Sequence, residues 1–137
     1  MSENLGLGLI SHILMRNNGE SVLQGNLKKR IIDLSLSPEG TALLFTFEDG
    51  KKMSLADEGQ SCCEMRYMST DDDLRYYIDG NFLGVEVKGG PTEEDRYGTH
   101  EVQFLEVKTD IGSFTMANHN QHNGYYGGFA LSAREIP

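Results

Sequence analysis

This chain is short of cysteine, of long apolar runs and of positive charge, and each shortage excludes a class of protein. Its two cysteines, Cys62 and Cys63, are neighbours with no third to pair with, which excludes a disulfide framework and favours a reducing cytosol. No apolar run is long enough to span a bilayer. The N-terminal stretch carries neither an early basic region nor a small-residue cleavage site, so we expect no signal peptide.

The charge balance is strongly acidic. Twelve lysines and arginines stand against 21 aspartates and glutamates, for a net charge of −9 and a pI of about 4.8. A protein that coats duplex nucleic acid is usually basic, so we expect no ordinary nucleic-acid binding. The negative charge keeps the protein soluble, which is the more common use of acidity. Alternatively, the acidic protein imitates nucleic acid and binds a basic protein surface.

Alternation of apolar and polar residues predicts strands along most of the chain. The expected strands are 31–36, 41–48, 51–56, 82–87, 100–107, 113–118 and 125–131. The length of 137 residues predicts one domain, 1–137, with a sheet core at 31–137 and a helix or arm within 1–30. The expected fold class is α+β: a mostly antiparallel β-sheet with one or two short helices.

Turn and cap signals separate these strands. Ser37-Pro38-Glu39-Gly40 fits a type I turn, and Asp49-Gly50 is a hairpin signal. We expect Thr70 to cap a short helix whose first turn holds Asp71–Asp73, where the helix dipole favours negative charge. Residues 89–98 have the composition of a polar loop.

Metal binding and catalysis have candidate residues but no spacing that brings them together. Adjacent residues of a strand point to opposite faces, so Cys62 and Cys63 chelate one metal poorly. The geometry of His119 and His122 in a hairpin loop is undefined. A cysteine with His119 would supply a nucleophile and a base. We nevertheless expect no metal, no cofactor and no catalytic residue, and we predict that neither cysteine is catalytic.

The most unusual stretch is NHNQHNGYYGGF, residues 118–129. Its tyrosines offer faces on which bases stack, and its amides carry the donors and acceptors that read ribose hydroxyls and base edges. Its glycines let the backbone approach a phosphate. Asn123-Gly124 also predicts a hairpin between 113–118 and 125–131, and a hairpin with one buried tyrosine explains the same composition equally well.

Three motifs together resemble a family of small phage proteins. They are SCCE at 61–64, FLGVEV at 82–87 and HNGYYGGF at 122–129. The family includes the Thoeris anti-defence sponges, which sequester a cyclic ADP-ribose signal. The resemblance extends loosely over 31–131 and is sharpest at the double cysteine and at 123–128.

The resemblance implies a mixed sheet and a homo-oligomer built from dimers, with a nucleotide signal bound uncleaved at subunit interfaces. This chain departs from the family where His119 stands in place of an arginine. Histidine lacks the fixed charge and planar fork with which arginine binds phosphate. The residues after the cysteines, Glu64, Met65 and Arg66, also differ. The ligand is therefore a cyclic ADP-ribose-like molecule, a cyclic oligonucleotide or something else.

We therefore expect a phage-type immune-evasion protein of the host bacterial cytosol that sequesters a small, cyclic nucleotide signal without cleaving it. The expected ligand-binding residues are His119, Asn120, His122, Asn123, Gly124, Tyr125, Tyr126 and Arg66. Lys28, Lys29 and Arg30 are further candidates for local positive charge. Two alternatives stay open: an enzyme that degrades such a signal, and an acidic inhibitor that docks directly on a host defence protein.

Overall fold

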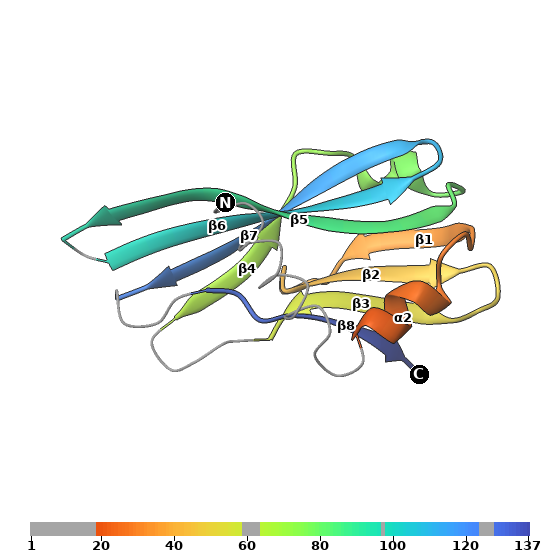
Figure 1. Ribbon diagram of the computed structural model, residues 1–137, viewed down its shortest axis with the longest axis horizontal. Helices are drawn as coiled ribbons and strands as arrows, with labels where there is room; N and C mark the ends of the chain where they lie inside the picture. The colour runs from red at the N-terminus through yellow and green to blue at the C-terminus, as the bar shows by residue number, and fades with distance from the viewer. Residues whose placement is uncertain (1–18, 59–63, 97, 124–127) are drawn as a thin grey trace.

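The computed structural model describes residues 19–58, 64–96, 98–123 and 128–137 (Figure 1). Among these residues, eight strands form two four-stranded antiparallel sheets. The first sheet has the order β1-β2-β3-β8 and the second has the order β4-β7-β6-β5. The elements are α2 (Gly19–Gly25), β1 (Ile31–Leu36), β2 (Ala42–Phe47), β3 (Lys52–Asp57), β4 (Met65–Ser69), the 3₁₀ helix η2 (Leu74–Tyr77), β5 (Phe82–Asp95), β6 (Gly98–Thr109), β7 (Gly112–His122) and β8 (Leu131–Ile136).

The prediction of an α+β, mostly antiparallel fold is confirmed. The predicted turn after β1 is present, because Gly40 has a φ of 75° and its N–H donates to the Ser37 carbonyl over 2.8 Å. The Asp49-Gly50 hairpin is present as well, with Gly50 at a φ of 85°. These turns depend on local residues, which is why sequence patterns identify them.

Three local predictions are wrong. Residues 89–98 are not a loop, since β5 continues to Asp95 with a bulge between Gly89 and Thr92. This half of β5 lies at the edge of its sheet, where both faces are polar, so no apolar alternation marks it. The cap of η2 is Asp73, whose side chain accepts from the Arg75 N–H, while the Thr70 hydroxyl donates to the Thr115 carbonyl.

The hairpin predicted around Asn123-Gly124 is also wrong. β7 pairs with β4 and β6 in the second sheet, whereas β8 pairs with β3 in the first. The segment between β7 and β8 therefore passes from one sheet to the other. β7 instead forms its hairpin with β6 through Asp110 and Ile111.

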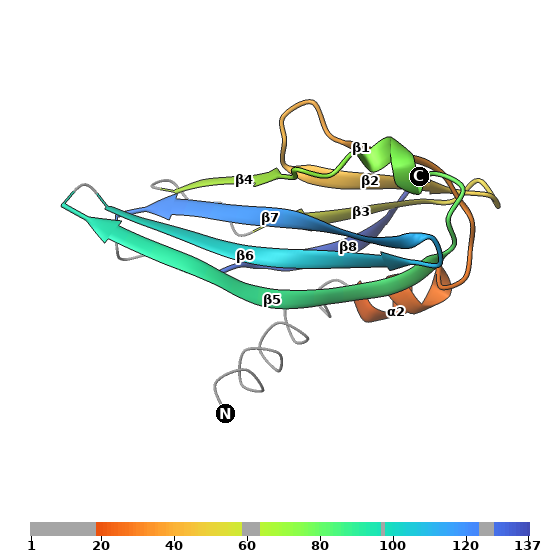
Figure 2. The same cartoon turned by 90° about the horizontal axis from the view of Figure 1, so that it is seen from above.

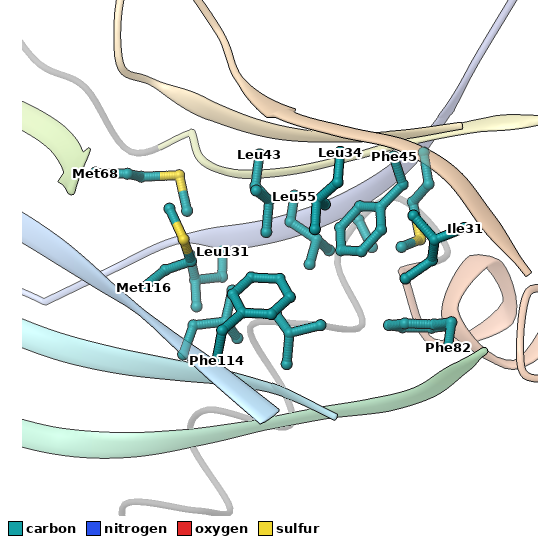
Figure 3. Close-up of a cluster of buried hydrophobic side chains, with 14 of the residues drawn as sticks. Ile31, Leu34, Leu43, Phe45, Leu55, Met68, Phe82, Phe114, Met116 and Leu131 are labelled. Atoms are coloured by element: carbon teal, nitrogen blue, oxygen red, sulfur yellow. The ribbon is translucent and has the colours of Figure 1, made fainter. Parts of the chain in front are cut away.

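One hydrophobic core lies between the two sheets (Figure 3). Its largest members are Phe45 and Phe47 of the first sheet and Phe82 and Phe114 of the second. The rings of Phe45 and Phe82 meet edge to face with centroids 5.5 Å apart. Leu74, Tyr77 and Ile78 pack against this core.

The second sheet is longer than the first and extends past it at one end (Figures 1 and 2). β5, β6 and β7 are the longest strands. β5 and β6 are joined at their far ends, where Asp95 pairs with Gly98. α2 lies at the opposite end of the molecule. No helix among the described residues is long and apolar enough to cross a membrane.

Candidate functional site

The inner face of the second sheet changes from apolar to amide side chains along its length. On β7 the buried side chains run Phe114, Met116, Asn118, Asn120, because every second residue of a strand faces the same side. Gln103 of β6 lies opposite Asn118 in the register. We call Gln103, Asn118 and Asn120 the amide row. It begins where the core ends, since Met116 is the last apolar side chain of β7 on this face (Figure 3).

The amide row is buried without full hydrogen bonding. Asn118 and Asn120 are 0% exposed and Gln103 is 7% exposed. Both polar atoms of the Asn118 side chain, the Oδ1 of Asn120 and the Oε1 of Gln103 have no hydrogen-bond partner in the described part of the chain. A buried polar group without a partner destabilises the fold by about 1–3 kcal/mol. Ordered water, an ion or a bound ligand are the usual partners of such groups.

Gly128, which follows the tyrosine pair in sequence, is held against the amide row. Its carbonyl accepts from Asn120 Nδ2 over 3.2 Å and from Arg66 Nη1 over 3.0 Å. Its N–H donates to Glu101 Oε1 over 3.0 Å, and the same oxygen lies 2.8 Å from His122 Nε2. These contacts hold Gly128 beside the amides.

Arg66 is part of a buried ion cluster rather than a solvent-facing cation. Its guanidinium contacts Asp57 at 2.8 Å and Glu64 at 2.5 Å, and all three side chains are at most 6% exposed. Burial lowers the pKa of Arg66, but hydrogen bonds to Glu64 and Asp57 outweigh burial and raise it. Asp57 Oδ1 also accepts the Ala130 N–H over 2.9 Å. Arg66 thus connects β3, β4 and the segment that leads into β8.

The outer face of the second sheet carries a separate polar group. His119 Nε2 lies 2.8 Å from Ser69 Oγ, and His119 Nδ1 lies 2.9 Å from His100 Nε2. The Tyr67 ring stacks on the His119 ring, with centroids 4.4 Å apart and planes 7° from parallel. Burial first, and then the nearby His100, lower the pKa of His119. The imidazole is therefore held in its neutral form near neutral pH.

The structure separates residues that the sequence analysis grouped together. Arg66 and Asn120 both contact the Gly128 carbonyl on the inner face, and His122 joins them through Glu101, which accepts the Gly128 N–H. His119 points to the outer face because it neighbours Asn120 on a strand. Asn123 directly follows β7. The remaining predicted residues, Gly124, Tyr125 and Tyr126, lie outside the described residues, as do Cys62 and Cys63 and the possible helix at 5–16.

The basic residues proposed to balance a ligand's charge lie elsewhere. Lys29 contacts Asp49 at 2.6 Å, and Arg30 contacts Asp79 at 2.9 Å. Both lie in the link between α2 and β1. Among the described residues, no three His, Cys, Asp or Glu side chains converge as a metal site.

Sequence reasoning missed Gln103, Glu101, His100 and Ser69. A signal for the first two was present in HEVQFLEV, where they share the alternating register of the core residues Leu105 and Val107. Polar residues in core-facing register, continuing a run of buried leucine and valine, mark the polar end of an inner face. No local signal links Ser69 to His119, because they meet only through the pairing of β4 with β7.

The comparisons with known proteins give a family without a function. No curated protein matches the chain, and no solved structure matches it. One family model matches residues 24–131, a span that includes the amide row and every strand from β1 to β7, and it is described as a domain of unknown function, DUF7448. Because that match covers most of its length, the chain belongs to the DUF7448 family.

Proposed function

We propose that this protein binds a small nucleotide-type ligand at the amide row and holds it without cleaving it. The observation that carries the proposal is the set of buried amide atoms without partners on Gln103, Asn118 and Asn120. Amide groups present donors and acceptors side by side, as base edges and ribose hydroxyls do. A ligand of that kind would satisfy atoms that the described chain leaves unpaired.

The charges around the amide row favour the base and ribose of such a ligand over its phosphates. Asp57, Glu64 and Glu101 bring three carboxylates to this end of the sheet, and Arg66 is already bound to two of them. A phosphate placed here would meet net negative charge. We infer that the amides contact the uncharged part of the ligand and that phosphate groups, where present, point away from this cluster.

The biological setting rests on the resemblance to phage anti-defence sponges. It supports a role in immune evasion in the host bacterial cytosol, a cyclic ADP-ribose-like or cyclic oligonucleotide ligand, and a homo-oligomer built from dimers. The tyrosines 125 and 126 would supply the stacking faces. Gly128 supports their inclusion, because it follows Tyr126 by two residues in the sequence and its carbonyl accepts from Asn120 and Arg66.

The test is a titration of the full-length protein with cyclic ADP-ribose isomers, cyclic di- and trinucleotides, and linear nucleotides. We expect at least one to bind and to return intact after heat denaturation and chromatography. Asn118→Leu keeps the side-chain volume but removes both amide atoms. It should weaken binding roughly 5- to 150-fold, the equivalent of one or two lost buried hydrogen bonds.

Met116→Leu is the matched control, because Met116 is equally buried on the same face of β7 and has no hydrogen-bonding amide. It should bind like the unaltered protein. Return of a cleaved product would favour an enzyme, and failure of every nucleotide would favour a docking inhibitor. Equal binding by Asn118→Leu would remove the amide row from the ligand site.

The assembly is tested separately by sedimentation at micromolar concentration. We predict a homodimer or a larger even-numbered oligomer, since a ligand site at the end of a sheet needs a second wall to enclose its occupant. A monomer at every concentration would contradict this prediction.

A further inference from the structure

We propose that the outer face of the second sheet is a hydrolase-type site in which Ser69 is the nucleophile, His119 its base and His100 the residue that positions the base. The site lies on the opposite face of β7 from the amide row, so it is independent of the proposed function. Its three side chains come from β4, β7 and β6 and are partly buried. The sequence does not predict this combination, because His119 lies 50 residues after Ser69 and 19 residues after His100.

The hydrogen bonds form a continuous chain with one consistent proton arrangement. For His119 Nε2 to accept the Ser69 hydroxyl over 2.8 Å, the His119 proton must be on Nδ1. That N–H then donates to His100 Nε2 over 2.9 Å. A nucleophile bound to a base, and a base held by a third group, is the arrangement of serine hydrolases. Here the third group is a neutral imidazole in place of a carboxylate.

The His119 ring is held in position on its face as well as at its edges. Tyr67 lies directly opposite His119 in the β4–β7 register and stacks on it. The Tyr67 hydroxyl in turn accepts a hydrogen bond from Gln121 Nε2 over 3.1 Å. The neutral form of His119, favoured by its burial, is the form that can take a proton.

Ser69 also lines a hollow of about 260 Å³. Phe104 and Ala117 form part of its apolar lining, and Asp71 and Asp72 bring negative charge to it. The Asp72 carboxylate is fixed by the Thr115 N–H over 2.8 Å. A hollow of this size admits a small acyl group, and its carboxylates favour a neutral or cationic substrate. We therefore assign the substrate class as small carboxylic esters without negative charge.

The reaction needs only the ester and water. Ser69 Oγ attacks the carbonyl carbon while its proton passes to His119 Nε2, and the bond from that carbon to the alcohol oxygen then breaks. The bonding electron pair leaves with the alcohol, which takes the proton from His119. Water next attacks the Ser69 ester, gives one proton to His119, and releases the carboxylic acid as that proton returns to Ser69 Oγ.

The experiment exposes the full-length protein to an uncharged alkyl fluorophosphonate and follows intact mass. We expect one adduct per chain, located on Ser69 by peptide mass spectrometry, and none in Ser69→Ala. His119→Gln should slow labelling by roughly 100-fold or more, the usual contribution of a general base. Ser113→Ala is the control, because Ser113 is exposed on the same face of β7. It should label at the unaltered rate.

His100 is tested by comparing His100→Gln with His100→Leu. The glutamine oxygen still accepts the His119 Nδ1–H, so His100→Gln should label faster than His100→Leu by about tenfold while both melt at similar temperatures. Equal rates would remove the positioning role. An unlabelled Ser69 in the unaltered, folded protein, or His119→Gln labelling at the unaltered rate, would overturn the proposal without any bearing on nucleotide binding.

Discussion

At the scale of single residues, Asn118 is where binding and stability conflict. Its side chain is fully buried with no partner for either polar atom among the described residues. Asn118→Leu removes both unsatisfied groups at similar volume, so we expect it to raise the free energy of unfolding by about 1–3 kcal/mol. Urea denaturation of the ligand-free protein measures this, with Met116→Leu as the buried control expected to change by less than about 1.5 kcal/mol. A destabilised Asn118→Leu would show that the amide is already satisfied.

His119 makes stability depend on pH in a defined direction. Burial and His100 lower its pKa in the folded state below the usual 6.5. Above that value the imidazole is neutral in both states. As the pH falls through 6.5, the unfolded chain takes up the proton first. The free energy of unfolding therefore decreases with falling pH until the pH reaches the folded-state pKa of His119.

His119→Gln should therefore lose less stability than the unaltered protein between about pH 7.5 and about pH 5.5. Paired urea titrations at these two values measure the difference. Carboxylates such as Asp73, whose pKa is lowered by its hydrogen bonds to Arg75, act in a more acidic window and are common to both proteins. Parallel losses of stability would show that His119 titrates normally.

At the scale of elements, β5 is shaped by its bulge. A side chain at Gly90 would place its Cβ 2.6 Å from the Val102 carbonyl oxygen of β6, whereas one at Gly89 would have no atom within 4 Å. Gly90→Ala should therefore destabilise the protein by about 1–3 kcal/mol. Gly89→Ala should be neutral or stabilise it by up to about 1 kcal/mol. Chemical denaturation of these neighbouring variants measures the contrast, and equal effects would contradict the described register.

Sequence reasoning succeeded for elements whose signals are local and failed where position in the sheet decides. β2 and β3 were predicted closely because one face is buried in the core, which produces clear alternation. β1 was predicted as well, although a bulge between Ile31 and Asp33 interrupts its alternation. The far half of β5 gave no such signal because it is an edge strand beside other polar residues. The capping of η2 failed for another reason: η2 begins at Leu74, so its cap is Asp73. Thr70 lies before the helix, where its hydroxyl accepts the Asp72 N–H and donates to the Thr115 carbonyl.

At the scale of the whole molecule, the two sheets share one core and should unfold together. Phe82 of β5 contacts both Phe45 and Phe47 of β2. Phe82→Ala should lower the free energy of unfolding by about 3–5 kcal/mol. Leu83→Ala, on the next residue and 47% exposed, should change it by less than about 0.5 kcal/mol.

Far-ultraviolet circular dichroism and tyrosine fluorescence should report coincident transitions in these proteins. Tyrosine is the natural reporter because the chain has no tryptophan. Two separate transitions would show that the sheets fold independently of their shared core.

The amino-acid sequence by itself determined the strand periodicity, the turns before β2 and β3, and the concentration of amides and histidines near the C-terminus. These features depend on residues close together in the chain. Only the tertiary structure decided that β7 and β8 lie in different sheets, that His119 and Asn120 serve opposite faces, and that Ser69 and His100 meet the same imidazole. Such contacts depend on which strands pair and in what register, and local alternation leaves the choice of partner open.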